Sequence, residues 1–225
     1  MKNATINMEE ELYLDEIRDI QMRALTPQKA DEVERIFREI RDPNEKLIGL
    51  NILLVIFFHD KRYDEAMMSV EELVNDPEMA EYKAYLILKQ GQISELQGDF
   101  DAALGFYCRS LTIGKWPEYV CYFLWNHIGF CWLFKQEFVT AEWCCRKAIE
   151  VNPRRGEAWK NLGVSLEHQG KFTEALQCYF KAFSLSERKI ITVLHLRRII
   201  RRRHGFIEGL KDVRRQLFKN FRLLV

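Results

Sequence analysis

Residues 158–183, AWKNLGVSLEHQGKFTEALQCYFKAF, decide the fold. Their apolar side chains recur at helical spacing on two stripes, one with Trp159, Leu162 and Leu166, and the next with Phe172, Leu176, Tyr179 and Phe183. Gly170 lies between the stripes, where a helix must end and the chain must turn back. The stretch therefore predicts an antiparallel pair of helices.

The same pattern recurs along the chain, which is the signature of a repeat architecture. Trp159, Gly163, Ala175 and Ala182 each lie 34 residues after Trp125, Gly129, Ala141 and Ala148. An earlier copy carries Gly91, Gly98, Phe100, Ala103 and Tyr107 in the same order, and a degenerate copy has Leu54 in place of the first glycine. The periodicity predicts repeat units at 47–80, 84–117, 122–155 and 156–189.

The stretch from Trp125 to Pro153, together with residues 158–182, resembles the tetratricopeptide repeat family. The resemblance implies an all-α fold in which antiparallel helix pairs stack into a right-handed α-solenoid superhelix. It also implies a concave groove, lined by the first helix of each repeat unit, that holds a peptide or partner protein. Members of the family are usually adaptors without catalytic activity, so the resemblance implies a protein-binding scaffold rather than an enzyme.

Both ends of the chain depart from the repeat pattern. Residues 1–46 are expected to form an N-terminal helical cap or a decayed repeat, whose second helix begins at Thr26 and Pro27. Residues 190–225 are expected to form a basic degenerate repeat or capping helices, because Arg197 occupies a small-residue position and Gly209 replaces an alanine.

The composition is that of a globular protein, with 48% hydrophobic and 30% charged residues and few glycines or prolines to interrupt helices. The first residues contain no apolar core of signal-peptide length, which predicts a cytoplasmic protein. Six cysteines without a CxxC pair predict reduced, buried thiols. Histidines are scattered over separate repeat units, and His127 with Cys131 offers only two ligands, so no cofactor, metal or catalytic site is expected.

Residues 119–134, YVCYFLWNHIGFCWLF, contain no charged residue. A membrane span is disfavoured, since about 18–20 apolar residues are needed and the run keeps the phase of the repeat. One helical stripe belongs to the repeat core, and the opposite stripe should face the groove. The expected partner groove comprises Asn51, Val55, Phe58, Tyr85, Leu88, Phe123, Asn126, His127, Phe130, Phe134, Lys160 and Asn161.

A helix that is apolar on all sides is normally buried on all sides, so something should cover Phe123, Phe130 and Phe134. Three occupants remain open from the sequence. The chain could cover them itself, through its C-terminal FKNFRLLV, its N-terminal helices or a second copy. A partner's amphipathic helix or peptide is the second occupant, and a small apolar ligand is the third. The Lys and Asn pattern that clamps acidic chaperone tails is absent.

Charge is concentrated at the C-terminal end, although the whole chain carries only +1. From residue 188 onward, the chain contains twelve Lys and Arg and two acidic residues, a net charge of 12 − 2 = +10. The expected basic patch comprises Arg197, Arg198, Arg201, Arg202 and Arg203. It fits a solvated capping helix, an acidic protein or lipid partner, or a nucleic-acid backbone. Nucleic acid ranks behind a protein partner because no aromatic residues interleave with the arginines.

Overall fold

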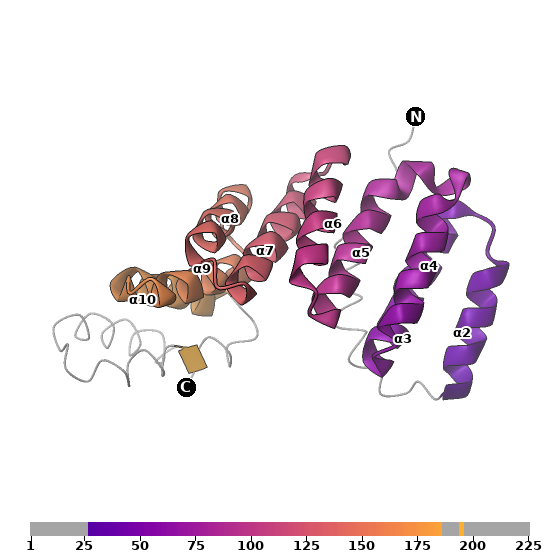
Figure 1. Ribbon diagram of the computed structural model, residues 1–225, viewed down its shortest axis with the longest axis horizontal. Coiled ribbons are helices and arrows are strands. Elements are labelled where there is room, and N and C mark those ends of the chain that lie inside the picture. The colour runs from indigo at the N-terminus through magenta and orange to yellow at the C-terminus, as the bar shows by residue number, and fades with distance from the viewer. Residues whose placement is uncertain (1–26, 186–193, 196–225) are drawn as a thin grey trace. The chain divides into compact units, whose positions relative to one another are not determined.

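A computed structural model of the chain describes residues 27–185 and 194–195, and the all-α prediction is confirmed there (Figure 1). The chain divides into two compact units, Met1–Ser110 and Leu111–Val225. The helices that begin in the first compact unit are α2 (Pro27–Glu39), α3 (Pro43–Asp60), α4 (Tyr63–Asn75), the 3-10 helix η1 (Pro77–Tyr82), α5 (Lys83–Gln97) and α6 (Phe100–Ile113). The second contains α7 (Glu118–Phe134), α8 (Phe138–Val151), α9 (Gly156–His168) and α10 (Phe172–Leu185). Residues 1–26 and 196–225 lie outside the described residues, so the expected caps at the two ends stay predictions.

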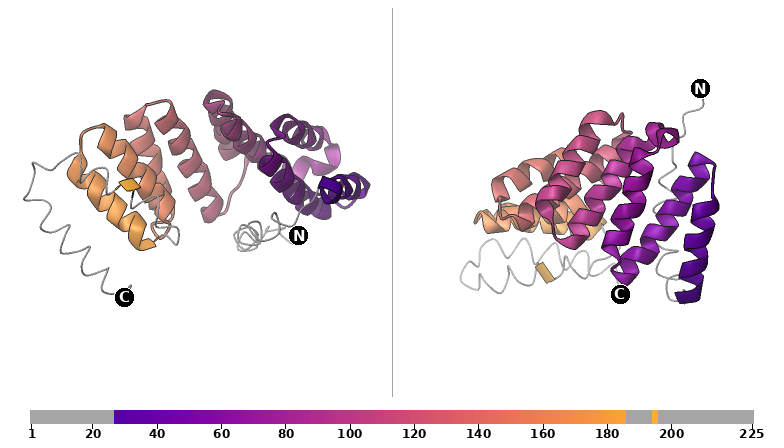
Figure 2. Two further views of the ribbon diagram at one scale, coloured as in Figure 1. Left: turned by 90° about the horizontal axis from the view of Figure 1, so that it is seen from below. Right: turned by 45° about the vertical axis from the view of Figure 1, so that its right-hand side comes forward.

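Helix ends follow from local chemistry. The carboxylate of Asp42 accepts hydrogen bonds from the backbone N–H groups of Asn44 and Glu45, each at 3.0 Å, and Pro43 supplies the first helical position of α3. This cap starts α3 at Pro43, earlier than residue 47 where the periodicity placed the repeat unit. After α5 the chain turns at Gly98, whose φ of +83° suits a residue without a Cβ. The chain then runs back as the second helix of the pair (Figure 2).

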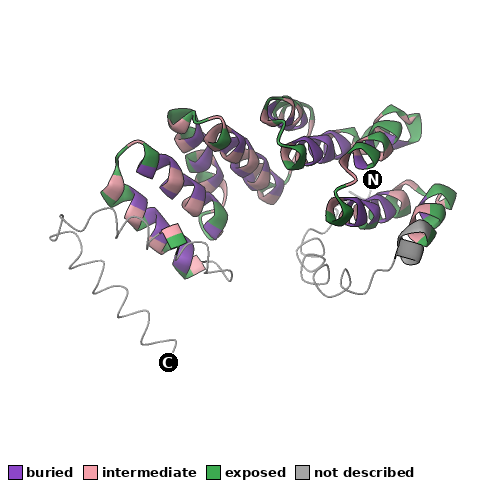
Figure 3. Cartoon of the chain, turned by 60° about the horizontal axis from the view of Figure 1, so that its bottom comes forward, coloured by how far each residue is buried: buried purple, intermediate pink, exposed green. Residues whose placement is uncertain are grey.

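One register is shared by all four helix pairs. The second helix of each pair begins with an aromatic residue, namely Tyr63, Phe100, Phe138 or Phe172. An alanine follows three residues later in every case and is fully buried: Ala66, Ala103, Ala141 and Ala175. Nine residues before the aromatic stand Leu54, Gly91, Gly129 and Gly163, which are buried too. The buried positions gather on the sides of the helices that face their neighbours (Figure 3).

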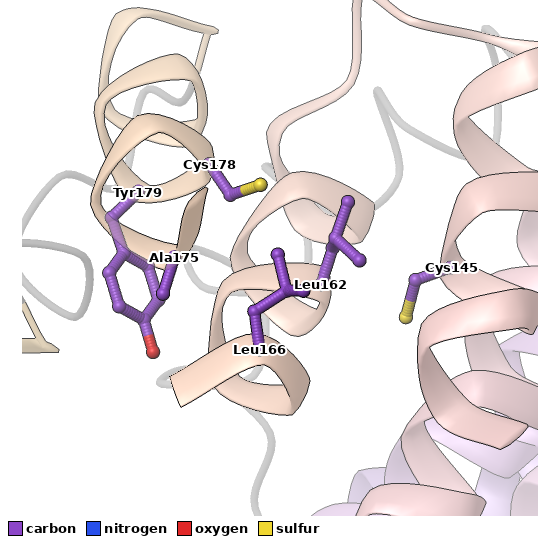
Figure 4. Close-up of a cluster of buried hydrophobic side chains, with 6 residues drawn as sticks. All are labelled: Cys145, Leu162, Leu166, Ala175, Cys178 and Tyr179. Carbon is purple, nitrogen blue, oxygen red and sulfur yellow. The ribbon is translucent and has the colours of Figure 1, made fainter. Parts of the chain in front are cut away.

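One hydrophobic cluster of the second compact unit lies between α8, α9 and α10. It contains Cys145, Leu162, Leu166, Ala175, Cys178 and Tyr179. Figure 4 shows the two leucines of α9 between Cys145 on one side and the side chains of α10 on the other. Partly buried side chains, among them Trp159 and Phe180, pack around this cluster.

The cysteines are all free thiols, and four of the six are buried. Burial raises the pKa of the Cys178 thiol to about 11, which keeps it protonated and unreactive at neutral pH. The expectation of buried thiols is wrong for Cys108, which is exposed, and Cys121 is only half-buried. Cys108 lies on the outer side of α6, where the repeat pattern requires no apolar side chain.

Candidate functional site

The candidate site is a face formed by two first helices of the second compact unit, α7 and α9, which contact each other. We call it the α7–α9 face. It carries seven of the residues that the sequence assigned to a groove: Phe123, Asn126, His127, Phe130 and Phe134 from α7, and Lys160 and Asn161 from α9. Within α7, only the first residue, Glu118, is charged.

An aromatic pair marks the C-terminal end of this face. The rings of Phe130 and Phe134 lie one helical turn apart, with their centroids 4.7 Å from each other. Phe130 is half-buried, whereas Phe134 remains 55% exposed. The described residues thus leave part of Phe134 exposed, and what covers this ring stays a prediction. Phe134 is the last residue of α7, and the chain turns beyond it through Gln136, whose φ is +62°.

The other end of the face is covered by a cation. The guanidinium carbon of Arg155 lies 4.5 Å from the ring centroid of Phe123 and 5.6 Å from that of Tyr122. An arginine above an aromatic ring is attracted by the negative face of the ring. Sequence reasoning missed Arg155, because it precedes α9 and lies outside the helical period. The available signal was its position immediately before a first helix.

Tyr122 holds the start of α9 against α7. Its hydroxyl oxygen accepts a hydrogen bond from the backbone N–H of Ala158 at 3.2 Å and lies 3.3 Å from a carboxylate oxygen of Glu157. The first N–H groups of a helix have no partner within the helix, so this bond satisfies one of them. Burial and the neighbouring Glu157 charge raise the pKa of Tyr122, which keeps the hydroxyl neutral.

A pair of amides joins the two helices in the middle of the face. The side-chain N–H of Asn161 donates to the side-chain oxygen of Asn126 at 3.1 Å, and both residues are buried. This bond uses the oxygen of Asn126 and one donor of Asn161. Each asparagine has both a carbonyl and an NH₂ group, so the amide NH₂ of Asn126 and the amide oxygen of Asn161 are not used by this bond.

Lys160 adds a half-buried cation beside this pair. Burial lowers the pKa of its ammonium group, and the charge of Glu157 acts in the opposite direction. A cation that is partly withdrawn from water interacts more strongly with a nearby acidic group than a fully solvated lysine does. The face therefore combines aromatic rings, amides and two cations, Arg155 and Lys160.

The remaining predicted groove residues lie in the first compact unit. Val55 and Phe58 of α3 are half-buried. The hydroxyl of Tyr85 donates to the side-chain oxygen of Asn51 at 2.7 Å, which links α5 to α3. Tyr85 and Leu88 are buried, so these two residues present little surface to a partner. Sequence reasoning placed them on an open apolar path because it read only their helical phase.

The predicted basic patch, Arg197, Arg198, Arg201, Arg202 and Arg203, lies outside the described residues and stays a prediction. Among the described residues, no three His, Cys, Asp or Glu side chains gather as a metal site would require. No helix in the described part of the chain has both the length and the apolar character needed to cross a membrane.

Several known proteins are similar to parts of this chain. The sequence profile of the tetratricopeptide repeat matches residues 156–188. Human tetratricopeptide repeat protein 7B is 29% identical over 126 residues, which cover 54% of this chain and 14% of that protein. Bovine BBSome complex member BBS4 is 30% identical over 138 residues, which cover 60% of this chain and 24% of that protein. The chain thus spans about a quarter or less of the length of these relatives.

A solved structure shows the same fold. MamA from Desulfovibrio magneticus RS-1 superposes with a TM-score of 0.58, covering 86% of this chain and 96% of that chain at 13% sequence identity. At this low sequence identity, the similarity shows a shared fold and nothing about function. The neighbours are solenoids of antiparallel helix pairs, the class that the repeat spacing indicated.

Proposed function

Since the chain belongs to the tetratricopeptide repeat family, we propose that it is a non-enzymatic protein-interaction module that binds a partner's peptide or amphipathic helix at the α7–α9 face. The observation that carries this proposal is the aromatic pair Phe130 and Phe134, whose second ring is 55% exposed at the end of a helix with no charged residue after Glu118. Exposed aromatic side chains that are grouped rather than scattered are typical of interaction surfaces.

The chemistry of the face suggests which groups a partner segment should carry. Phe130 and Phe134 provide an apolar anchor point for a bulky aliphatic or aromatic side chain. The buried bond between Asn126 and Asn161 holds α7 against α9 beneath the face. Arg155 and Lys160 favour a carboxylate near Phe123, at the other end of the face. The expected partner segment therefore carries an apolar anchor at one end and an acidic residue at the other.

The names of the relatives are compatible with a role in a protein complex, but they do not name a partner for this chain. One matched relative is named as a member of the BBSome complex, and the chain resembles only part of it. A repeat scaffold keeps its helix packing while its surface residues vary, so the partner must be inferred from the face itself.

A site-specific photo-crosslinker tests the proposal. We would place it at Phe134 in the full chain, expose the protein to its native lysate, and identify the cross-linked peptides by mass spectrometry. The matched control places the same crosslinker at Val139, which is exposed on α8. The proposal predicts one protein segment captured at residue 134 and not at residue 139, and this segment should then bind as a purified peptide.

Other outcomes assign the face differently. Cross-links to the C-terminal FKNFRLLV of the same chain would show that the chain covers its own face, and cross-links to a second copy would show a homo-oligomer. If crosslinkers at residues 134 and 139 captured the same segments with equal yield, a specific binding site at the α7–α9 face would be contradicted. The predicted basic patch is tested separately, since changing Arg201 and Arg202 to Glu should abolish capture only if that patch makes the main contact.

A further inference from the structure

Helix α3 is apolar on two sides, and only one of them is covered by described residues. Its buried side includes Leu50, Leu53, Leu54, Ile56 and Phe57. On another side, Ile48 is 61% exposed and Ile52 is 46% exposed, one helical turn apart. Half-buried Val55 extends the same stripe by another turn. We call Ile48, Ile52 and Val55 the α3 stripe.

The shared register shows what normally covers this stripe. Counting eleven residues back from the aromatic that begins each second helix, Ile52 of α3 occupies the position of Lys89 in α5, His127 in α7 and Asn161 in α9. Lys89 is 5% exposed, Asn161 is 4% exposed and His127 is half-buried, although all three are polar. An isoleucine at this position is nevertheless 46% exposed. The exposure of Ile52 therefore reflects a missing neighbour rather than the chemistry of the residue.

In the second compact unit that neighbour is the first helix of the preceding pair. Asn161 of α9 is bonded to Asn126 of α7. In the first compact unit, α5 is linked to α3 by a different bond, between Tyr85 and Asn51. Helix α3 already contacts α2, which stands where a preceding second helix belongs. Among the described residues, no first helix precedes α2 as its pair.

The sequence before α2 has the length and pattern of such a helix. Residues 8–25 end immediately before Thr26 and Pro27, where α2 begins, and span as many residues as the 18 of α3. At helical spacing they place Tyr13, Ile17, Ile20 and Ala24 on one stripe. Of the other fourteen positions, eight are charged and five are apolar.

The charges of the two segments are complementary in an antiparallel arrangement. Residues 9–11 are three consecutive glutamates. A helix over 8–25 that runs antiparallel to α2 places them beside the C-terminal end of α2, where Arg35, Arg38 and Arg41 are exposed. Acidic residues also favour the first turn of the helix that they begin.

We infer that residues 8–25 form the helix that covers the α3 stripe, as the first helix of a pair completed by α2. The α3 stripe is then an internal contact of the chain and not a docking surface for another protein. This inference concerns the first compact unit and does not depend on the proposed function of the α7–α9 face.

The test uses the photo-crosslinking residue p-benzoylphenylalanine in place of Ile52 in the purified full chain. Mass spectrometry should find the cross-link on residues 8–25. A mixture of isotopically heavy and light chains should give heavy–heavy and light–light products only. The matched control places the crosslinker at Met68, which is 69% exposed on α4 and should give no cross-link to residues 8–25. Heavy–light products would assign the stripe to a second copy and overturn the inference, as would a failure to cross-link residues 8–25.

A second variant addresses the apolar contact directly. With the crosslinker kept at residue 52, Ile17→Glu combined with Ile20→Glu should lower the cross-link yield about tenfold or more, because it places two charges against the α3 stripe. Asp15→Asn combined with Arg18→Gln changes two residues on the opposite side of the predicted helix and should leave the yield unchanged. Equal yields in the two variants would overturn the inference.

Discussion

The ring of Tyr179 on α10 lies directly against the Cα of Gly163 on α9. A Cβ added at Gly163 would lie 2.6 Å from a ring carbon of Tyr179, and Gly91 faces Tyr107 with the same 2.6 Å separation. These glycines do not have a positive φ, so the backbone conformation does not require them. They are required by packing, because the tyrosine ring occupies the space of a side chain.

Replacing Gly163 by alanine should therefore destabilise the protein by ~1–3 kcal/mol, since the tyrosine ring must move in a filled core. Urea unfolding followed by far-UV circular dichroism measures this change. Gly105→Ala is the matched control, because Gly105 is exposed inside α6 and its added Cβ would meet nothing within 4 Å. The free energy of unfolding of the Gly105→Ala protein should rise by ~0.5–1 kcal/mol, because alanine has a higher helix propensity than glycine. Equal effects of the two substitutions would contradict the packing explanation.

Tyr179 also bonds the acidic residue one helical turn beyond the glycine. Its hydroxyl donates to a carboxylate oxygen of Glu167 at 2.9 Å in a buried setting. Tyr179→Phe keeps the ring and removes this bond, so the free energy of unfolding should fall by ~1.5–3 kcal/mol, the usual size for a bond to a charged group. Tyr63→Phe, at the partly exposed start of α4, should change it by less than ~0.5 kcal/mol. A Tyr179→Phe protein as stable as the Tyr63→Phe protein would show that the bond contributes nothing.

The lowered pKa of Glu142 predicts how the free energy of unfolding changes at acid pH. Burial opposes its charged form, yet hydrogen bonds from Lys171, Arg146 and Gln169 outweigh this effect and lower its pKa from 4.5 to about 2. Its side chain is only 14% exposed. A carboxyl group whose pKa is lower in the folded state stabilises the protein above its unfolded pKa, and this contribution is lost as the pH falls from about 4.5 to about 2.

Glu142→Gln should accordingly lower stability at pH 7 by ~1–3 kcal/mol and flatten the decline in melting temperature over that acid range. Melting curves at closely spaced pH values measure both effects. Glu150→Gln is the control, because the Glu150 side chain is 63% exposed and its ion pair with Lys147 is worth less than ~1 kcal/mol. An unchanged acid profile in Glu142→Gln would contradict the assigned role.

The helix pairs could be predicted from the sequence because their determinants are local. Gly98 and Gly170 turn the chain, and the recurring alanines mark where two helices approach closely. The repeat period does not reveal that α3 begins at Pro43, because Asp42 and Pro43, which begin it, lie outside that period.

The details of the candidate site could not be predicted in the same way. Helical phase places Phe123 and Phe134 on one stripe of α7, but it does not show that Arg155 covers the first ring while the second is 55% exposed. The bond between Asn126 and Asn161 depends on how α7 and α9 are offset, and a periodicity within each helix carries no information about that offset.

The measurement that tests the central claim most directly is the dissociation constant of the partner segment captured at residue 134. It would be measured for the unmodified chain, for Phe130→Ala combined with Phe134→Ala, and for Val139→Ala. The account predicts that the double substitution weakens binding by about 30-fold or more, as loss of an aromatic anchor does at interaction hot spots. Val139→Ala should leave the constant unchanged. An equal dissociation constant for all three proteins would contradict binding at the α7–α9 face.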